Sequence, residues 1–213
     1  MDKNLEFVVD EKIKRTISAL ERNNMEGYCV NNKEELIEKI KEICKDGEMV
    51  SVGGSMSLFE CGVIDLLKSG KYNFLDRYKE GLTKDEMKEI YRKSFFCDTY
   101  FTSSNAVTED GMLYNVDGNG NRVAAMLYGP DKVVVIIGIN KIVKDLDSAI
   151  ERTKTVSAPA NCRRLNRNTP CHKMGECMNC NSNERICNEY TLIKRQGTKG
   201  RIKVIILKEE LGY

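Results

Sequence analysis

Apolar residues recur along the chain at two spacings, one typical of amphipathic helices and the other of short buried strands. Five stretches carry apolar residues three or four positions apart among charged ones, which is the helical pattern. The predicted helices cover residues 4–24, 33–45, 57–68, 83–94 and 145–156. Short apolar runs bounded by turn residues lie between the helices and predict strands. The predicted strands cover residues 28–30, 49–52, 72–75, 98–103, 112–116, 133–137 and 202–207.

Capping signals support two of these helices, and the order of the elements predicts the fold class. The pair Asn31-Asn32 precedes the second helix as its cap, and Thr83 and Glu86 have the spacing of a capping box. The run over residues 133–137 is the most apolar strand, as expected for a strand buried on both faces. Because strands and helices alternate, we expect an α/β protein, a three-layer sandwich with a largely parallel sheet.

A change of composition near the C-terminus predicts three parts. Residues 1–156 carry the alternating strands and helices of the α/β domain. Residues 157–190 have little apolar periodicity and contain five cysteines, so we interpret them as a metal-binding insertion. Residues 191–213 contain the final strand, which we expect to return to the main sheet. This order predicts that the insertion lies near an edge of the domain.

Charge and hydropathy limit the partners that the chain can be expected to have. The net charge is +2, and the basic residues cluster without interleaved aromatic residues, so no nucleic-acid partner is predicted. No apolar run approaches the ~20 residues needed to cross a membrane, so no membrane span is expected. The N-terminal residues contain no apolar signal core, and we expect a cytoplasmic protein. The sequence is compatible with a homo-oligomer.

The stretch over residues 108–122, TEDGMLYNVDGNGNR, holds an unusual density of hydrogen-bonding side chains. Its two Asp-Gly pairs predict turns on either side of a short strand. Gly118 and Gly120 would let the backbone approach a ligand closely, and Arg122 offers a planar fork for phosphate or carboxylate. The stretch therefore indicates either a ligand site or a solvated double hairpin.

A second candidate site follows the strand over residues 49–52. Gly53, Gly54 and Ser55 form a tight turn that leads at once into a helix. Unpaired backbone N–H groups and the helix dipole would then point the same way, which favours an anion. A simple strand-to-helix turn explains the same residues, and neither the Rossmann glycine pattern nor the Walker lysine is present.

The cysteines of residues 157–190 have a spacing typical of metal ligands. Cys171, Cys177, Cys180 and Cys187 are separated by five, two and six residues, and Cys162 is a spare candidate. Nine cysteines in a cytoplasmic protein favour metal binding or redox chemistry over structural disulfides. A [4Fe–4S] cluster suits four thiolates with one close pair, zinc is the second choice, and a redox disulfide within the close pair is the third.

The sequence resembles the lactate-utilisation (LUD) domain family, in the branch with a cysteine-rich C-terminal segment. The resemblance is carried by SVGGSMSLFECG, DTYFTSSNAVTEDGMLYNVDGNGNR, YGPDKVVVIIGINKIV and the cysteine segment. It implies a fold similar to ribose-5-phosphate isomerase and CoA-transferase-like domains, with a ligand cleft. Members of the wider family occur with iron–sulfur partner proteins in the bacterial oxidation of lactate to pyruvate. The implied cleft residues are Gly53, Gly54, Ser55, Glu60, Asn105, Thr108, Glu109, Asp110, Gly111, Asp117, Asn119, Asn121 and Arg122.

Two functions follow from these patterns. The first is an enzyme or subunit of a redox pathway that acts on a small anionic metabolite such as lactate or pyruvate. Arg122 would hold the anion, and Glu109 or Glu60 would be the general base. Replacing Arg122 by lysine should then weaken anion binding and leave thermal stability nearly unchanged. The second is a non-catalytic metal or redox sensor, or an assembly module, with an effector-binding cleft.

Overall fold

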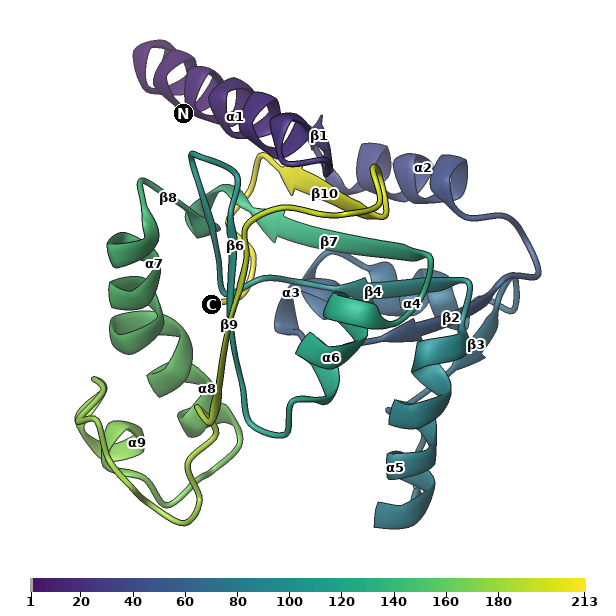
Figure 1. Ribbon diagram of the computed structural model, residues 1–213, viewed down its shortest axis with the longest axis vertical. Helices are drawn as coiled ribbons and strands as arrows, with labels where there is room; N and C mark the ends of the chain where they lie inside the picture. Colours follow the sequence, from purple (N-terminus) through teal and green to yellow (C-terminus); the bar gives the residue numbers. More distant parts are fainter. Residues whose placement is uncertain (1) are drawn as a thin grey trace.

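A six-stranded parallel sheet forms the centre of the protein. The structure, a computed structural model, describes residues 2–213. The sheet has the strand order β1-β10-β7-β4-β2-β3, and every neighbouring pair in it is parallel. Its strands are β1 (Glu26–Val30), β2 (Met49–Val52), β3 (Asn73–Leu75), β4 (Thr99–Thr102), β7 (Lys132–Gly138) and β10 (Ile202–Leu207). The last strand of the chain therefore lies inside the sheet, between β1 and β7 (Figure 1).

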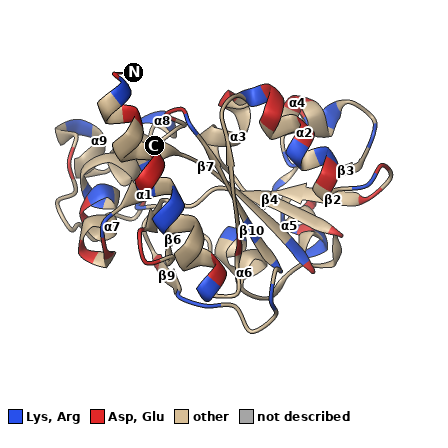
Figure 2. Cartoon of the chain, turned by 90° about the horizontal axis from the view of Figure 1, so that it is seen from above, with Lys and Arg blue, Asp and Glu red and all other residues tan. Residues whose placement is uncertain are grey.

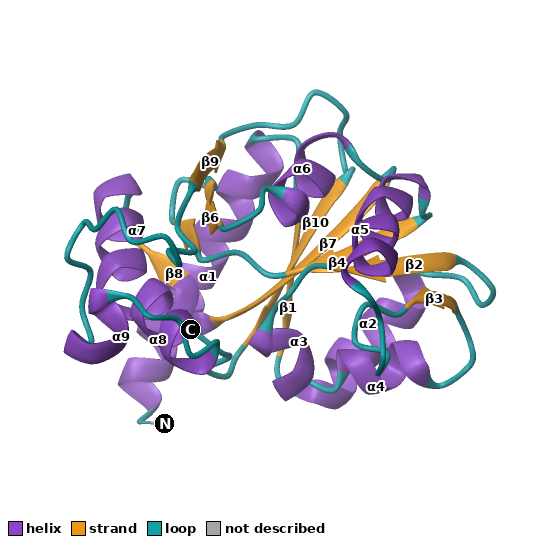
Figure 3. Ribbon diagram, turned by 90° about the horizontal axis from the view of Figure 1, so that it is seen from below, coloured by secondary structure: helices purple, strands orange, loops and turns teal. Residues whose placement is uncertain are grey.

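Helices cover both faces of the sheet, and successive residues of β7 point to opposite layers. Val134 and Ile136 pack with α2 (Lys33–Ile43), α3 (Met56–Glu60) and α4 (Val63–Lys68). Val133, Val135 and Ile137 pack on the other side, against α1 (Lys3–Arg22), α6 (Asn121–Tyr128) and a second sheet. Figure 3 shows α2, α3 and α4 together on one side of the sheet, and α6 and the second sheet on the other. The predicted three-layer α/β fold with a parallel sheet is confirmed.

The second sheet connects the central layer to the cysteine segment. It has the order β8-β5-β6-β9, with β5 parallel to β8 and the other two pairs antiparallel. Its strands are β5 (Ala106–Thr108), β6 (Leu113–Asp117), β8 (Ile142–Val143) and β9 (Glu189–Ile193). The cysteine segment leaves α7 (Leu146–Arg152) through a π-helical turn and returns in β9, so it is anchored at both ends. It contains α8 (Ala158–Arg164) and α9 (Pro170–Met174), which lie beyond α7 in Figure 1.

Local signals predicted several helix ends correctly, whereas α6, α8 and α9 were missed and two other helices were merged into one. The Asn32 side chain accepts from the Glu35 amide, and Thr83 and Glu86 form the capping box of α5 (Lys84–Lys93). The single helix expected over residues 57–68 is wrong, because Gly62 adopts φ +76° and separates α3 from α4. Helix α6 was not predicted, since its eight residues directly follow a run of turn-forming residues.

Acidic and basic side chains are interspersed over the surface of the molecule. Both signs appear on helices α1, α2 and α4 in Figure 2. Within residues 2–213, no helix combines the length and the apolar character needed to cross a bilayer.

Candidate functional site

A cleft of about 720 Å³ opens at the carboxyl ends of the central strands. Its walls come from the loop after β2, the loop after β4, the start of α6, and the segment that follows α8. The carboxyl edge of a parallel sheet is where ligands collect in α/β proteins. Seven of the cleft residues implied by the family resemblance line this cleft: Gly54, Ser55, Asn105, Asp117, Asn119, Asn121 and Arg122.

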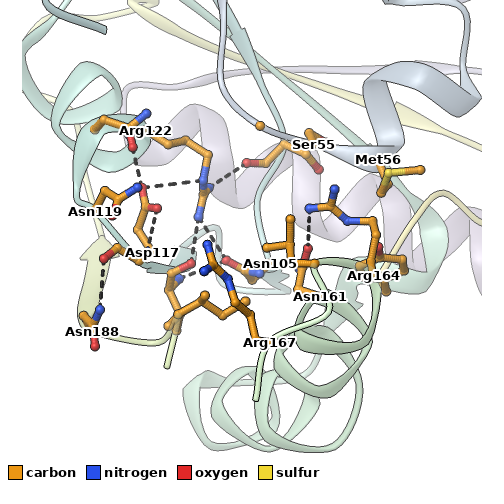
Figure 4. Close-up of a pocket in the computed structure, with 18 of the residues that line it drawn as sticks. Ser55, Met56, Asn105, Asp117, Asn119, Arg122, Asn161, Arg164, Arg167 and Asn188 are labelled. Carbon is orange, nitrogen blue, oxygen red and sulfur yellow. Dashed lines mark hydrogen bonds and ion pairs between the residues drawn. The ribbon is translucent and has the colours of Figure 1, made fainter. Parts of the chain in front are cut away.

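Arg122 is buried in the cleft wall, and its guanidinium is already bonded to the protein. Nη1 donates to the Ser103 carbonyl at 3.1 Å and to Asn115 Oδ1 at 2.6 Å. Nη2 donates to Asn105 Oδ1 at 3.2 Å and to the Val116 carbonyl at 3.0 Å. These contacts join the loop after β4 to β6. Figure 4 shows Arg122 reaching toward Asn105. Arg122 therefore braces the wall, and the fork expected to hold an anion is filled by protein acceptors.

Asp117 occupies the N-terminal end of α6, where the helix dipole favours a negative charge. Its Oδ2 accepts from the backbone amides of Arg122 at 3.1 Å and Val123 at 3.2 Å, which belong to the first turn of α6. Its Oδ1 accepts from the Gly118 amide at 2.8 Å. A carboxylate of the chain thus takes the favourable position at the start of this helix.

Gly53 lies behind the cleft wall. A Cβ at this position would meet Arg122 Cγ at 2.8 Å and Thr102 Oγ1 at 2.9 Å. The absence of a side chain at Gly53 therefore lets Arg122 pack against the end of β2, which is a structural reason for this glycine.

Five predicted site residues lie away from the cleft. Glu109 pairs with Arg15 of α1, with 3.0 Å between Oε2 and Nη2. Glu60 is exposed and accepts from the Gly212 amide at 2.6 Å. The structure does not bring either proposed general base to the cleft. The other three surround the turn between β5 and β6, beside α1: Thr108, Asp110 and Gly111.

Four arginines reach the cleft that sequence patterns did not assign to it. Arg77 lies over the rings of Tyr78 and Tyr91, and its Nε is enclosed with no hydrogen-bond partner among residues 2–213. Arg164 enters from the end of α8 and Arg167 from the segment after it, on a different side from Arg122 (Figure 4). The fourth is Arg185, from the loop before β9. For Arg164, Arg167 and Arg185, the sequence signal was a cluster of basic residues next to the cysteines, for which a solvated loop was the alternative explanation.

Lys141 is another cleft residue that the sequence analysis missed. It ends the short 3-10 turn after β7, and only 3% of it is exposed. Its Nζ donates to Ser57 Oγ at 2.8 Å and to Ser103 Oγ at 3.0 Å. Burial, with smaller effects from the nearby guanidinium groups of Arg152 and Arg122, lowers the pKa of Lys141 to about 7. Its position just after the most apolar strand was the one available signal.

The five cysteines of the C-terminal segment line one small cavity. Cys162 and Cys171 are buried, and the other three are partly exposed. The Asn179 amide donates to Cys177 Sγ at 3.4 Å, inside the close pair of cysteines. The cavity wall contains Cys162, Cys171, Cys177, Cys180 and Cys187. The tertiary structure therefore gathers all four predicted ligands and the spare candidate.

The cysteine cavity and the cleft share one residue, Arg185. This side chain lines both, and it donates to the carbonyls of Cys180 and Cys187 at 2.7 Å each. Within residues 2–213, no three histidine, cysteine, aspartate or glutamate side chains are already close enough together to hold a metal ion. The free volume of the cavity is about 10 Å³, so the thiols would have to rearrange around any metal.

These features define a three-layer α/β protein with an arginine-bearing cleft beside a cysteine-lined cavity. The crystal structure of a DUF162 family protein from Deinococcus radiodurans has the same fold, with a TM-score of 0.57. It is 15% identical to this chain, and the similarity covers 93% of this chain and 98% of that one. The tetrameric eIF2B-beta2-delta2 complex from C. thermophilum is more distant, at a TM-score of 0.44 and 16% identity over 95% of this chain and 59% of that one.

The family assignment rests on the sequence. The chain belongs to the LUD domain family, whose sequence model matches residues 13–207. No curated protein matches it. Membership of the branch with a cysteine-rich C-terminal segment stays a prediction.

Proposed function

We propose that this LUD domain protein is a subunit or enzyme of a redox pathway that binds a small anionic metabolite, such as lactate or pyruvate, in its cleft. In this proposal, thiolates of the cysteine cavity hold a metal cofactor, with a [4Fe–4S] cluster ahead of zinc. The observation that supports it most is Arg185, which lines both the cleft and the cysteine cavity. An anion in the cleft would therefore lie close to a redox centre.

The donor set of the cavity fits such a cofactor. Five thiols face it, and neither a histidine nor a carboxylate lines it. Thiolates are the ligands of iron–sulfur clusters and of structural zinc sites. Arg185 would place a positive charge beside the negative charge that four thiolates bring. An iron–sulfur cluster held there would supply one-electron transfer. Cys162 makes a fifth donor available, so one thiol can remain outside the ligand set.

The arginines give the cleft its preference for anions. Arg77 lines the cleft and donates to the Tyr91 hydroxyl at 2.8 Å through Nη2, which leaves other donors of its guanidinium for a carboxylate. Arg164 donates to Asn161 Oδ1 at 3.0 Å through one nitrogen, which leaves other donors of its guanidinium for a ligand. In this proposal, arginines from other elements bind the anion, which is the role that the sequence analysis gave to Arg122.

The cofactor is tested by analysis of protein purified without oxygen. We expect iron with acid-labile sulfide and a broad visible absorption band. The double variant Cys177→Ser, Cys180→Ser should lose the metal, because it removes the closely spaced pair of ligands. Cys29→Ser is the matched control, since Cys29 is exposed on β1, outside the cavity. Zinc without colour would contradict the redox role. If the double variant held as much metal as the unmodified protein, Cys177 and Cys180 would not be ligands.

Anion binding is tested by calorimetry with pyruvate and with lactate. Arg77→Gln should weaken binding by roughly 10- to 100-fold, because a hydrogen bond to a charged group contributes about 1.5–3 kcal/mol. Arg15→Gln is the control, because Arg15 pairs with Glu109 on the side of α1 and does not line the cleft. Equal affinities of the two variants, or no binding of either acid to the unmodified protein, would contradict the proposal.

A further inference from the structure

Lys141 stands out among the buried side chains because no acidic group neutralises it. Both hydrogen-bond partners of its Nζ within residues 2–213 are hydroxyls, those of Ser57 and Ser103. Lys132, the first residue of β7, has a different environment from Lys141, which follows the other end of that strand. Lys132 Nζ lies 2.6 Å and 2.8 Å from the two carboxylate oxygens of Glu48.

The charged groups that face Lys141 come from three helices. Arg152 of α7 and Arg122 of α6 disfavour its protonated form, while Glu60 of α3 and the Cys61 thiol that follows it act weakly in the opposite direction. Burial is the largest of these effects, and it lowers the pKa of Lys141 together with the two arginines. A substantial fraction of Lys141 is therefore an uncharged amine at neutral pH. An uncharged amine is the nucleophilic form of lysine.

The two hydroxyls leave the reactive electron pair of this amine free. Ser57 Oγ donates to the Leu211 carbonyl and Ser103 Oγ donates to the Ser104 carbonyl, at 3.4 Å each. Both serine oxygens therefore accept from Nζ. An uncharged amine has two N–H donors and one lone pair, so two accepting hydroxyls occupy the donors and not the lone pair. Lys141 also lines the cleft that the anion is proposed to occupy.

We propose that Lys141 is the reactive amine of the cleft and forms an imine with the carbonyl carbon of an anionic 2-oxo acid. The inference rests on the proposed function, which supplies the anionic character of the ligand. Among small anionic metabolites, it selects those with a 2-oxo group. Pyruvate has a carbonyl group that can react in this way, whereas lactate has a hydroxyl group and cannot.

The step balances without an oxidant or a reductant. Lys141 Nζ forms a bond to C2 of the 2-oxo acid, and the C2–O bond breaks. The carbonyl oxygen leaves as water with the two hydrogens of the amine, and no electrons are transferred. The hydroxyls of Ser57 and Ser103 contact Nζ and can relay these protons. The carboxylate of the acid would be held by the cleft arginines.

The experiment traps the imine in the full chain, purified without oxygen. The protein is incubated with pyruvate, or in parallel with glyoxylate, and treated with borohydride, which reduces an imine to a stable secondary amine. Mass spectrometry of the intact chain and of its peptides then locates the product. We expect one addition, on Lys141, whose yield rises with pH around the Lys141 pKa of about 7. Lys132 is the internal control and should stay unmodified in the same sample.

Two variants make the outcome decisive. Lys141→Met should abolish the addition, and Lys132→Met should leave it unchanged. No addition from either acid, or an addition on other lysines alone, overturns the imine in the unmodified protein, whether or not Lys141→Met folds. Calorimetry with pyruvate on the unmodified protein separates the two proposals. Binding without trapping overturns the imine alone, and the absence of both overturns the anion cleft as well.

Discussion

Replacing Arg122 by alanine is expected to lower the free energy of unfolding by about 3–5 kcal/mol, the cost of breaking a buried charged network. Four hydrogen bonds to carbonyl and amide oxygens would be lost together, and the buried Asn115 Oδ1 would lose the 2.6 Å bond that it accepts from Arg122. Arg122→Lys keeps the charge near Asp117 but cannot reach all four oxygens, so it should also destabilise the protein. Urea denaturation followed by circular dichroism measures both variants.

The control for this prediction is Arg15→Ala. Arg15 forms an exposed ion pair with Glu109, and such pairs contribute about 0–1 kcal/mol. If Arg122→Ala were as stable as Arg15→Ala and lost pyruvate binding, the expectation drawn from the sequence would be correct, and Arg122 would be a ligand-binding residue.

Replacing Gly111 by alanine is expected to cost about 2–5 kcal/mol of stability. Gly111 adopts φ +81°, a conformation that disfavours other residues by about 1–2 kcal/mol. Its added Cβ would also lie 2.6 Å from the Ala19 carbonyl carbon and 2.7 Å from the Leu20 amide nitrogen, both in the backbone of α1. Overpacking of this kind costs about 1–3 kcal/mol. The measurement is again the free energy of unfolding in urea.

Gly47→Ala separates the two causes. Gly47 has nearly the same backbone conformation, φ +84°, and its added Cβ would have no atom within 4 Å. The control should therefore lose only the conformational part, about 1–2 kcal/mol. Equal losses in the two variants would show that α1 gives way, and that Gly111 does not fix the distance between α1 and the β5–β6 turn.

These two predictions give a structural role to two residues, Arg122 and Gly111, that the sequence analysis placed in a ligand-binding site. Arg122 and Gly111 belong to the same short stretch, and their types are those of many binding sites. In the folded chain, Arg122 holds the cleft wall together through hydrogen bonds, and Gly111 allows α1 to pack closely against the β5–β6 turn. The cleft remains a candidate site because Arg77, Arg164, Arg167 and Lys141 line it.

Much of the fold was open to prediction because its signals are local. The capping box of Thr83 and Glu86 spans four residues, and the strand over residues 133–137 is recognised by its own composition. Alternation of such elements predicted a parallel sheet covered on both faces. Helix α6 escaped because its N-cap, Gly120, offers no capping side chain and follows several turn-forming residues.

The sequence by itself determined the fold class, the family and a cysteine segment with closely spaced thiols, since these depend on residues near one another in the chain or on a pattern spread along all of it. Only the tertiary structure decided which side chains meet. Arg122 contacts Ser103 across 19 positions, and Lys141 contacts Ser57 across 84. Whether a buried charge finds an acid, a hydroxyl or a carbonyl depends on how distant segments pack. That packing left the Glu109 carboxylate beside α1 and the Lys141 amine in the cleft.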